Sequence, residues 1–111
     1  MSTRANIIVK DGLSTVYLYR HCDGYPRGLG AELQEFVKGF ENNIYWTSSY
    51  DIVGRLLTGA VEDIEHTSCL HWDIEYKYII DVTYGSPKLE TYERYSWDTS
   101  VDNEEVWTRI S

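Results

Sequence analysis

The chain has 111 residues, the size of one domain rather than two. It carries 18 Asp and Glu against 10 Lys and Arg, and the whole excess lies after residue 60: residues 1–60 hold six of each sign, whereas residues 61–111 hold twelve acidic and four basic residues. This uneven charge argues against nucleic acid as a direct partner and favours a basic protein surface. No run approaches the ~20 apolar residues of a membrane span, so we expect a cytoplasmic protein.

The chain begins with a pattern typical of a β-hairpin. Two strands are predicted over 5–10 and 13–20, and the dipeptide at 11–12, Asp-Gly, favours a two-residue turn between them. Residues 21–30 follow with three Gly and one Pro, a composition that predicts a structured loop.

Two helices are predicted next. Apolar residues fall at helical spacing over 29–40, with polar residues between them, and the Asn pair at 42–43 breaks the pattern. A second helix is predicted over about 48–60. Either Ser48 or Ser49 can cap its N-terminus, because a serine hydroxyl accepts a hydrogen bond from a free amide of the first turn.

The second half predicts further strands. Residues 75–84 alternate cleanly, residues 88–97 form the returning strand, and a short strand over 67–72 is one interpretation of an ambiguous acidic stretch. The predicted order is ββααβ(β)β: a two-layer α+β domain in which two helices cover one face of a largely antiparallel sheet. This domain comprises residues 1–97, and the acidic tail, 98–111, is either partly docked or flexible.

The most distinctive string is Tyr19-Arg20-His21-Cys22-Asp23-Gly24-Tyr25-Pro26, which continues to Gly28-Leu29-Gly30. It resembles a segment of small uncharacterised proteins of phages and other mobile elements. That family has no assigned reaction, so the resemblance implies a mobile-element origin and a bacterial host cytoplasm, and no catalytic roles. Small acidic phage proteins include inhibitors of host defence such as anti-CRISPR proteins.

The same string has two physical interpretations. Asp23-Gly24 can turn the chain, Pro26 fixes one backbone angle, and Arg20 can pair with Asp23, which together make a rigid connection from strand to helix. Alternatively, the rigid loop presents Arg20, His21 and Tyr25 as exposed contacts.

The sequence predicts no enzyme, no cofactor and no metal site. The His and Cys residues form two clusters, and four of the five are enough for a tetrahedral zinc site. There is no Cys-x2-Cys pair, however, and adjacent residues at a strand end point in opposite directions. The weak candidates for metal ligands are His21, His66, Cys69 and His71. Cys22 and Cys69 are expected as free thiols in a reducing cytoplasm, and a bridge between them is the alternative in an oxidising compartment.

The predicted partner-binding residues combine an acidic block with the aromatic side chains of the last hairpin. No Lys or Arg occurs between 61 and 76, and Tyr and Trp are frequent interface anchors. The set comprises Glu62, Asp63, Glu65, Asp73, Glu75, Tyr76, Tyr78, Tyr92 and Trp97. A second acidic group follows the hairpin and contains Asp98, Asp102, Glu104 and Glu105. The alternative is a solvated face with cross-strand ring pairs that stabilise the sheet.

Together these features favour a small acidic, non-enzymatic inhibitor. Its expected partner is a host protein with a basic surface, such as a CRISPR effector or another defence protein. The acidic residues would imitate the phosphates of nucleic acid or pair with a basic groove. A homodimer through the hairpin or a sheet edge is compatible with this hypothesis. The alternative is a small-ligand or zinc-binding module that uses the 20–30 loop with His66, Cys69 and His71.

Overall fold

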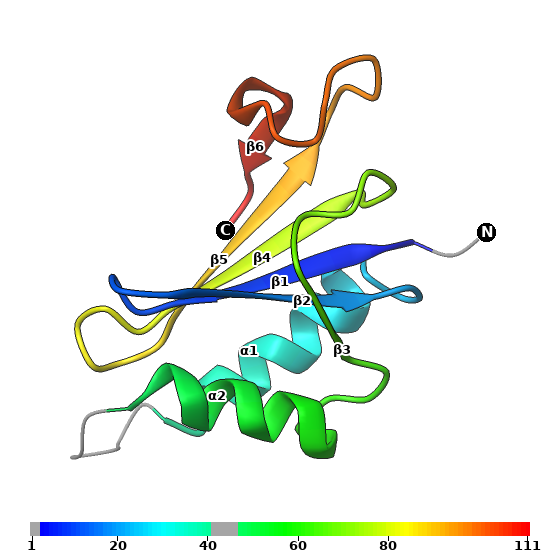
Figure 1. Cartoon of the computed structure of the whole chain (residues 1–111). Coiled ribbons are helices and arrows are strands. Elements are labelled where there is room, and N and C mark those ends of the chain that lie inside the picture. Colours follow the sequence, from blue (N-terminus) through cyan, green and yellow to red (C-terminus); the bar gives the residue numbers. More distant parts are fainter. Residues whose placement is uncertain (1–2, 41–46) are drawn as a thin grey trace.

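The computed structural model describes residues 3–40 and 47–111, and these form an α+β domain. The α+β class predicted from the sequence is therefore confirmed, with one mixed sheet and two helices (Figure 1). The elements in chain order are β1 (Ala5–Lys10), β2 (Thr15–Arg20), the helical turn η1 (Pro26–Gly30), α1 (Ala31–Lys38), α2 (Ser49–Arg55), the helical turn η2 (Leu56–Ala60), β3 (Glu65–Thr67), β4 (Tyr76–Asp81), β5 (Lys88–Arg94), the helical turn η3 (Glu104–Val106) and β6 (Trp107–Arg109).

The six strands form one mixed sheet in the order β3-β2-β1-β4-β5-β6. Four neighbouring pairs are antiparallel, and the central pair, β1 with β4, is parallel, with Ala5 opposite Tyr76. The central pair is parallel because β2 returns the chain to the starting end of β1, where Arg20 lies opposite Ala5, and β4 begins at that same end after the helices and β3. β6 is not among the strands predicted from the sequence; it lies in the predicted tail and forms the sheet edge beside β5.

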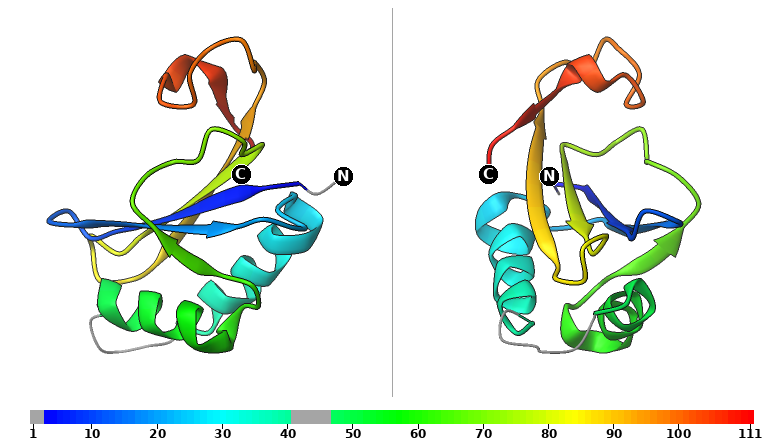
Figure 2. Two further views of the ribbon diagram at one scale, coloured as in Figure 1. Left: turned by 45° about the vertical axis from the view of Figure 1, so that its right-hand side comes forward. Right: turned by 90° about the vertical axis from the view of Figure 1, so that its left-hand side faces the viewer.

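Both helices lie on one side of the sheet, and the main core fills the space between (Figures 1 and 2). Alternate residues of β1 supply part of this core: Ala5, Ile7 and Val9 are completely buried. Leu33 of α1 and Ile52 of α2 close it from the helix side. The alternation explains the strand, because side chains of successive strand residues point to opposite faces of a sheet.

Local hydrogen bonds test two predictions, the N-cap of the second helix and the turn of the first hairpin. Ser48 is the N-cap of α2, since its hydroxyl accepts from the Asp51 amide at 3.1 Å. The predicted two-residue hairpin turn is wrong, because the loop runs over 11–14 and Asp11 organises it. The Asp11 carboxylate accepts from the amides of Ser14 and Leu13, at 2.7 and 2.9 Å, and these bonds lower its pKa to about 2. The predicted break at 42–43 lies outside the described residues.

Part of the C-terminal tail packs on the face of the sheet opposite the helices. A second, smaller core there contains Tyr19, Ile74, Val101, Val106 and Trp107. The Trp107 indole donates to the Val101 carbonyl at 3.0 Å, which ties the end of the chain to the preceding loop. Of the helices in the described ranges, none has the length and apolar content that crossing a membrane requires.

Candidate functional site

An open pocket of about 740 Å³ lies between two chain segments that are distant in sequence. One wall is the stretch 69–72, which leads into β4, and the other is the stretch 97–102, which follows β5. In Figure 2 these two segments lie at the same end of the molecule, on the side away from the helices. The lining residues are Cys69, Leu70, His71, Trp72, Arg94, Trp97, Asp98, Thr99, Ser100, Val101 and Asp102.

Arg94 at the end of β5 holds the two walls together. Its side chain is buried, with only 6% of the residue exposed, and its guanidinium lies 4.2 Å from the centre of the Trp97 ring. The guanidinium donates four hydrogen bonds of 2.8–3.3 Å to carbonyls on both sides, and burial lowers the pKa of Arg94. The four acceptors are the carbonyls of Trp72, Ile74, Ser96 and Thr99.

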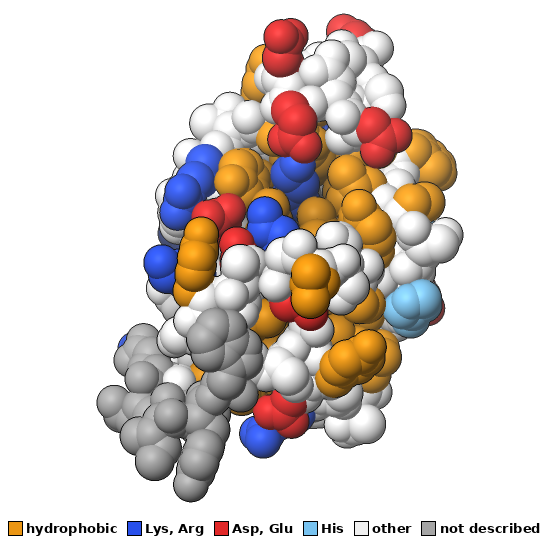
Figure 3. All heavy atoms as spheres, turned by 60° about the vertical axis from the view of Figure 1, so that its left-hand side comes forward, with side chains coloured by type: hydrophobic (Ala, Val, Ile, Leu, Met, Phe, Trp, Pro, Cys, Tyr) orange, Lys and Arg blue, Asp and Glu red, His pale blue; other side chains and the backbone are white. Residues whose placement is uncertain are grey.

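Large aromatic side chains stand exposed around this pocket. Trp72 is 78% exposed and Trp97 is 51% exposed, one on each wall, and the neighbouring Tyr95 is 65% exposed. Figure 3 shows one side of the molecule, where hydrophobic side chains surround a small basic group and acidic side chains gather toward the upper end. Exposed tryptophans around one pocket of a small domain are typical of an interaction surface.

The carboxylates of the pocket are not neutralised by neighbours. Asp98 and Asp102 are exposed, and neither forms an ion pair within residues 3–40 and 47–111. The stretches 61–76 and 95–106, which contain the two walls, hold nine Asp and Glu and no Lys or Arg. Among the described residues, Arg94 is the one Lys or Arg that lines the pocket, and its hydrogen bonds go to carbonyls.

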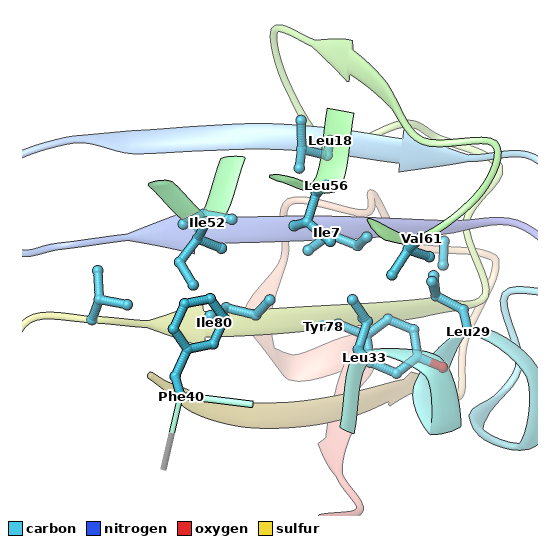
Figure 4. Close-up of a cluster of buried hydrophobic side chains, with 13 residues drawn as sticks. Ile7, Leu18, Leu29, Leu33, Phe40, Ile52, Leu56, Val61, Tyr78 and Ile80 are labelled. Atoms are coloured by element: carbon cyan, nitrogen blue, oxygen red, sulfur yellow. The ribbon is translucent and has the colours of Figure 1, made fainter. Parts of the chain in front are cut away.

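The prediction that Tyr78 contacts a partner is wrong. Tyr78 is completely buried and lies beside Leu29 and Leu33 under the helices (Figure 4). Its hydroxyl donates to the Gly24 carbonyl at 2.6 Å, and burial raises its pKa. Tyr76 lies two residues earlier on the same face of β4 and is half-buried against the same core. The alternation of the strand was read correctly, but the helices cover the face that carries these two rings.

Tyr92 lies on the opposite face of the sheet, where it covers a buried lysine. The Lys77 ammonium is 5.3 Å from the centre of the Tyr92 ring and 4.8 Å from that of Trp107. Its carboxylate partner is Glu104, at 3.5 Å, and the Lys77 side chain is only 4% exposed. Tyr92 is half-buried in this arrangement, and its ring face packs against the Lys77 ammonium.

The residues of the predicted acidic block lie in different local environments. Glu62, Asp63 and Glu65 are exposed at the turn before β3 and on β3 itself, the sheet edge opposite to β6. Asp73, by contrast, adjoins the pocket wall. Its carboxylate is 3.2 Å from Arg4 Nε and accepts from the Tyr19 hydroxyl at 3.1 Å. Burial, followed by the nearby Asp73 charge, raises the pKa of Tyr19 to about 12.

Glu75 follows Asp73 and is half-buried at the start of β4. Its backbone is bonded on both sides, since its amide donates to the Arg4 carbonyl and its carbonyl accepts from the Arg94 amide, each at 2.9 Å. Of the predicted partner-binding residues, Trp97 therefore lies in the pocket, while Asp73 and Glu75 lie on the chain just after its first wall.

The loop over 21–30 acts mainly as a structural connection. Arg20 is buried and forms an ion pair with Glu32 of α1, so the expected pairing with Asp23 and the expected role as an exposed contact are both wrong. A side chain at Gly24 would approach the Ala5 side chain to 2.8 Å, because β1 passes directly beneath the loop. His21 and Tyr25 remain exposed.

The weak candidates for metal ligands do not assemble. His71 stacks on the Tyr19 ring with 3.9 Å between the ring centres, and its Nε2 lies 2.8 Å from the Thr67 hydroxyl. His66 and Cys69 are exposed on β3 and just after it. Among the residues that the structure describes, no group of three or more His, Cys, Asp or Glu side chains is placed to hold a metal ion.

Arg94 and Trp72 are not among the site residues predicted from the sequence. In the sequence, a single arginine inside a strand cannot be distinguished from an arginine exposed to solvent. The acceptors of Arg94 are backbone carbonyls, which every residue has, so no residue type marks them in the sequence. Trp72 lies 22 residues before Arg94, so only the tertiary structure brings them together. Comparisons with protein-family models, with curated proteins and with solved structures found no match for this chain.

Proposed function

We propose that this chain is a non-enzymatic protein that binds a basic protein surface through the pocket between 69–72 and 97–102. One observation carries the proposal: the fold places Trp72, Trp97, Asp98 and Asp102 around a single open pocket. Tryptophans contribute binding energy because they bury a large apolar area, and they are enriched among the residues that dominate interfaces.

The charge of the chain supports a basic partner. The formal net charge of −8 comes entirely from residues 61–111, which supply both walls of the pocket. Carboxylates that form no ion pair attract a basic surface, accelerate association and make it sensitive to salt. The same charges disfavour binding to nucleic acid or to another acidic protein.

The proposed biological role is inhibition of a host defence protein. Its support is the resemblance of residues 19–30 to mobile-element proteins together with the acidic character of the pocket. A basic surface on such a host protein commonly binds nucleic acid, and an acidic protein seated on it would block that binding. Residues 19–30 are not part of the pocket, so the resemblance supports the role of the chain and not the position of the site.

Capture from a bacterial lysate tests the proposal with two charge-matched variants. Asp98→Lys/Asp102→Lys changes the pocket, whereas Glu62→Lys/Glu65→Lys changes the β3 edge, and each moves the formal net charge from −8 to −4. We expect the wild type and the β3-edge variant to retain the same basic protein at about 50 mM salt and to release it at about 500 mM, where screening is strong. The pocket variant should not retain it.

Two controls make the result decisive. Circular dichroism and urea unfolding of both variants check that the four exposed carboxylates can be replaced without unfolding. Retention of the same partner by the pocket variant, or loss of that partner in the β3-edge variant alone, would overturn the proposed site. A captured protein that is acidic, or one whose retention is insensitive to salt, would overturn the proposed partner chemistry.

A further inference from the structure

We propose that this pocket is the subsite for one arginine side chain of the basic partner. The inference rests on the proposed function for the identity of the partner as a protein. Binding of a guanidinium group to this pocket involves Trp72, Trp97, Asp98 and Asp102. It can therefore be measured with a small arginine compound in place of the partner.

The aromatic residues of the pocket favour a guanidinium group. Cations bind over the faces of aromatic rings, with tryptophan the best of them, and the flat guanidinium of arginine also stacks. The chain already shows this contact internally, because Arg94 stacks on Trp97. Half of Trp97 and most of Trp72 remain exposed beyond that contact.

The carboxylates provide the charge complement. Asp98 and Asp102 have no cationic partner in the described part of the chain, and both line the pocket with the two tryptophans. Arg94 leaves them available, since its guanidinium donors are directed at four backbone carbonyls. An arginine offers five N–H donors in a planar fork, which suits a carboxylate, whereas lysine offers a point charge.

The dimensions and rigidity of the pocket are compatible with this occupant. Its volume of about 740 Å³ lies within the roughly 300–1,000 Å³ typical of small-molecule sites, so an arginine can enter together with its flanking backbone. The Arg94 hydrogen bonds connect the two walls before any partner arrives, and a preformed site loses less conformational entropy on binding.

Nuclear magnetic resonance of the 15N-labelled protein tests the subsite directly. The probes are N-acetyl-arginine amide, N-acetyl-lysine amide and N-acetyl-citrulline amide; citrulline keeps the shape of arginine without its charge. We expect the arginine compound to shift the indole N–H signals of Trp72 and Trp97 with a millimolar Kd. The lysine compound should bind several-fold more weakly, and citrulline at least tenfold more weakly. The Trp107 indole, which is buried and does not line the pocket, should shift less than both of them.

Matched variants identify the groups responsible. Asp98→Asn/Asp102→Asn should weaken the binding of the arginine compound about tenfold. Glu62→Gln/Glu65→Gln makes the same change in charge and should leave the Kd of that compound unchanged. Trp72→Ala, at an exposed position where the fold is retained, should weaken it about as much as the double Asn variant. Equal shifts with citrulline and arginine, or equal effects of the two charge-matched variants, would overturn the subsite.

The outcomes separate this inference from the proposed function. If the Asp98→Lys/Asp102→Lys variant loses the captured partner but the arginine compound shifts no indole signal, the binding face stands and the arginine subsite is wrong. If the indole signals shift as expected while no basic protein is retained, the subsite stands and the proposed partner is wrong.

Discussion

Replacing Arg94 by methionine should lower the free energy of unfolding by about 2–4 kcal/mol. The substitution removes four hydrogen bonds from a charged donor, each worth roughly 1.5–3 kcal/mol when measured singly. The loss is smaller than their sum, because methionine keeps an apolar contact with Trp97 and the cost of burying a guanidinium disappears. A domain of this size has a stability of about 5–15 kcal/mol, so the variant stays folded and its loss is measurable.

Urea unfolding followed by circular dichroism measures this difference. Arg109→Met is the matched control, because Arg109 is an exposed arginine on neighbouring β6 whose contacts are a 3.8 Å ion pair with Glu90 and an exposed 3.1 Å hydrogen bond from Nε to the Ser111 carbonyl. Such a surface pair contributes no more than about 1 kcal/mol. Equal losses in the two variants would refute the reasoning, since the carbonyls around Arg94 would then be satisfied without it. The unfolding slope should stay the same, because the surface exposed on unfolding is nearly unchanged.

Two further predictions concern the charged residues of the fold. The pKa of Asp11 is lowered to about 2, so the stability that its carboxylate adds is present above the ordinary pKa of 3.8 and disappears as the pH falls from about 4 to 2. In urea titrations, the difference in the free energy of unfolding between the wild type and Asp11→Asn should shrink over this pH range. A difference that stays constant would contradict the assignment. Lys77→Met should lower the free energy of unfolding by less than about 1 kcal/mol, or raise it, because a buried charge can be replaced by an apolar side chain of similar length. A loss above about 2 kcal/mol in the same assay would show instead that the ion pair with Glu104 stabilises the fold strongly.

Local patterns in the sequence determined most of the secondary structure. The strand over 5–10 was predicted correctly, and Ser48 is one of the two residues predicted as the N-cap, because strand alternation and capping depend on residues within a few positions of each other. The α+β class followed from the same patterns. The acidic second half of the chain was also evident from the sequence alone, since charge depends only on composition.

The arrangement of these elements was decided by the tertiary structure. The parallel pairing of β4 with β1 placed Tyr78 under the helices, so a tyrosine predicted to bind a partner became a core residue. The pocket depends on contacts between segments more than 20 residues apart, and its central residue, Arg94, binds backbone carbonyls that no sequence pattern identifies. Which acidic residues line the pocket is therefore a consequence of long-range packing, since Trp72 meets Trp97, Asp98 and Asp102 only in the folded domain.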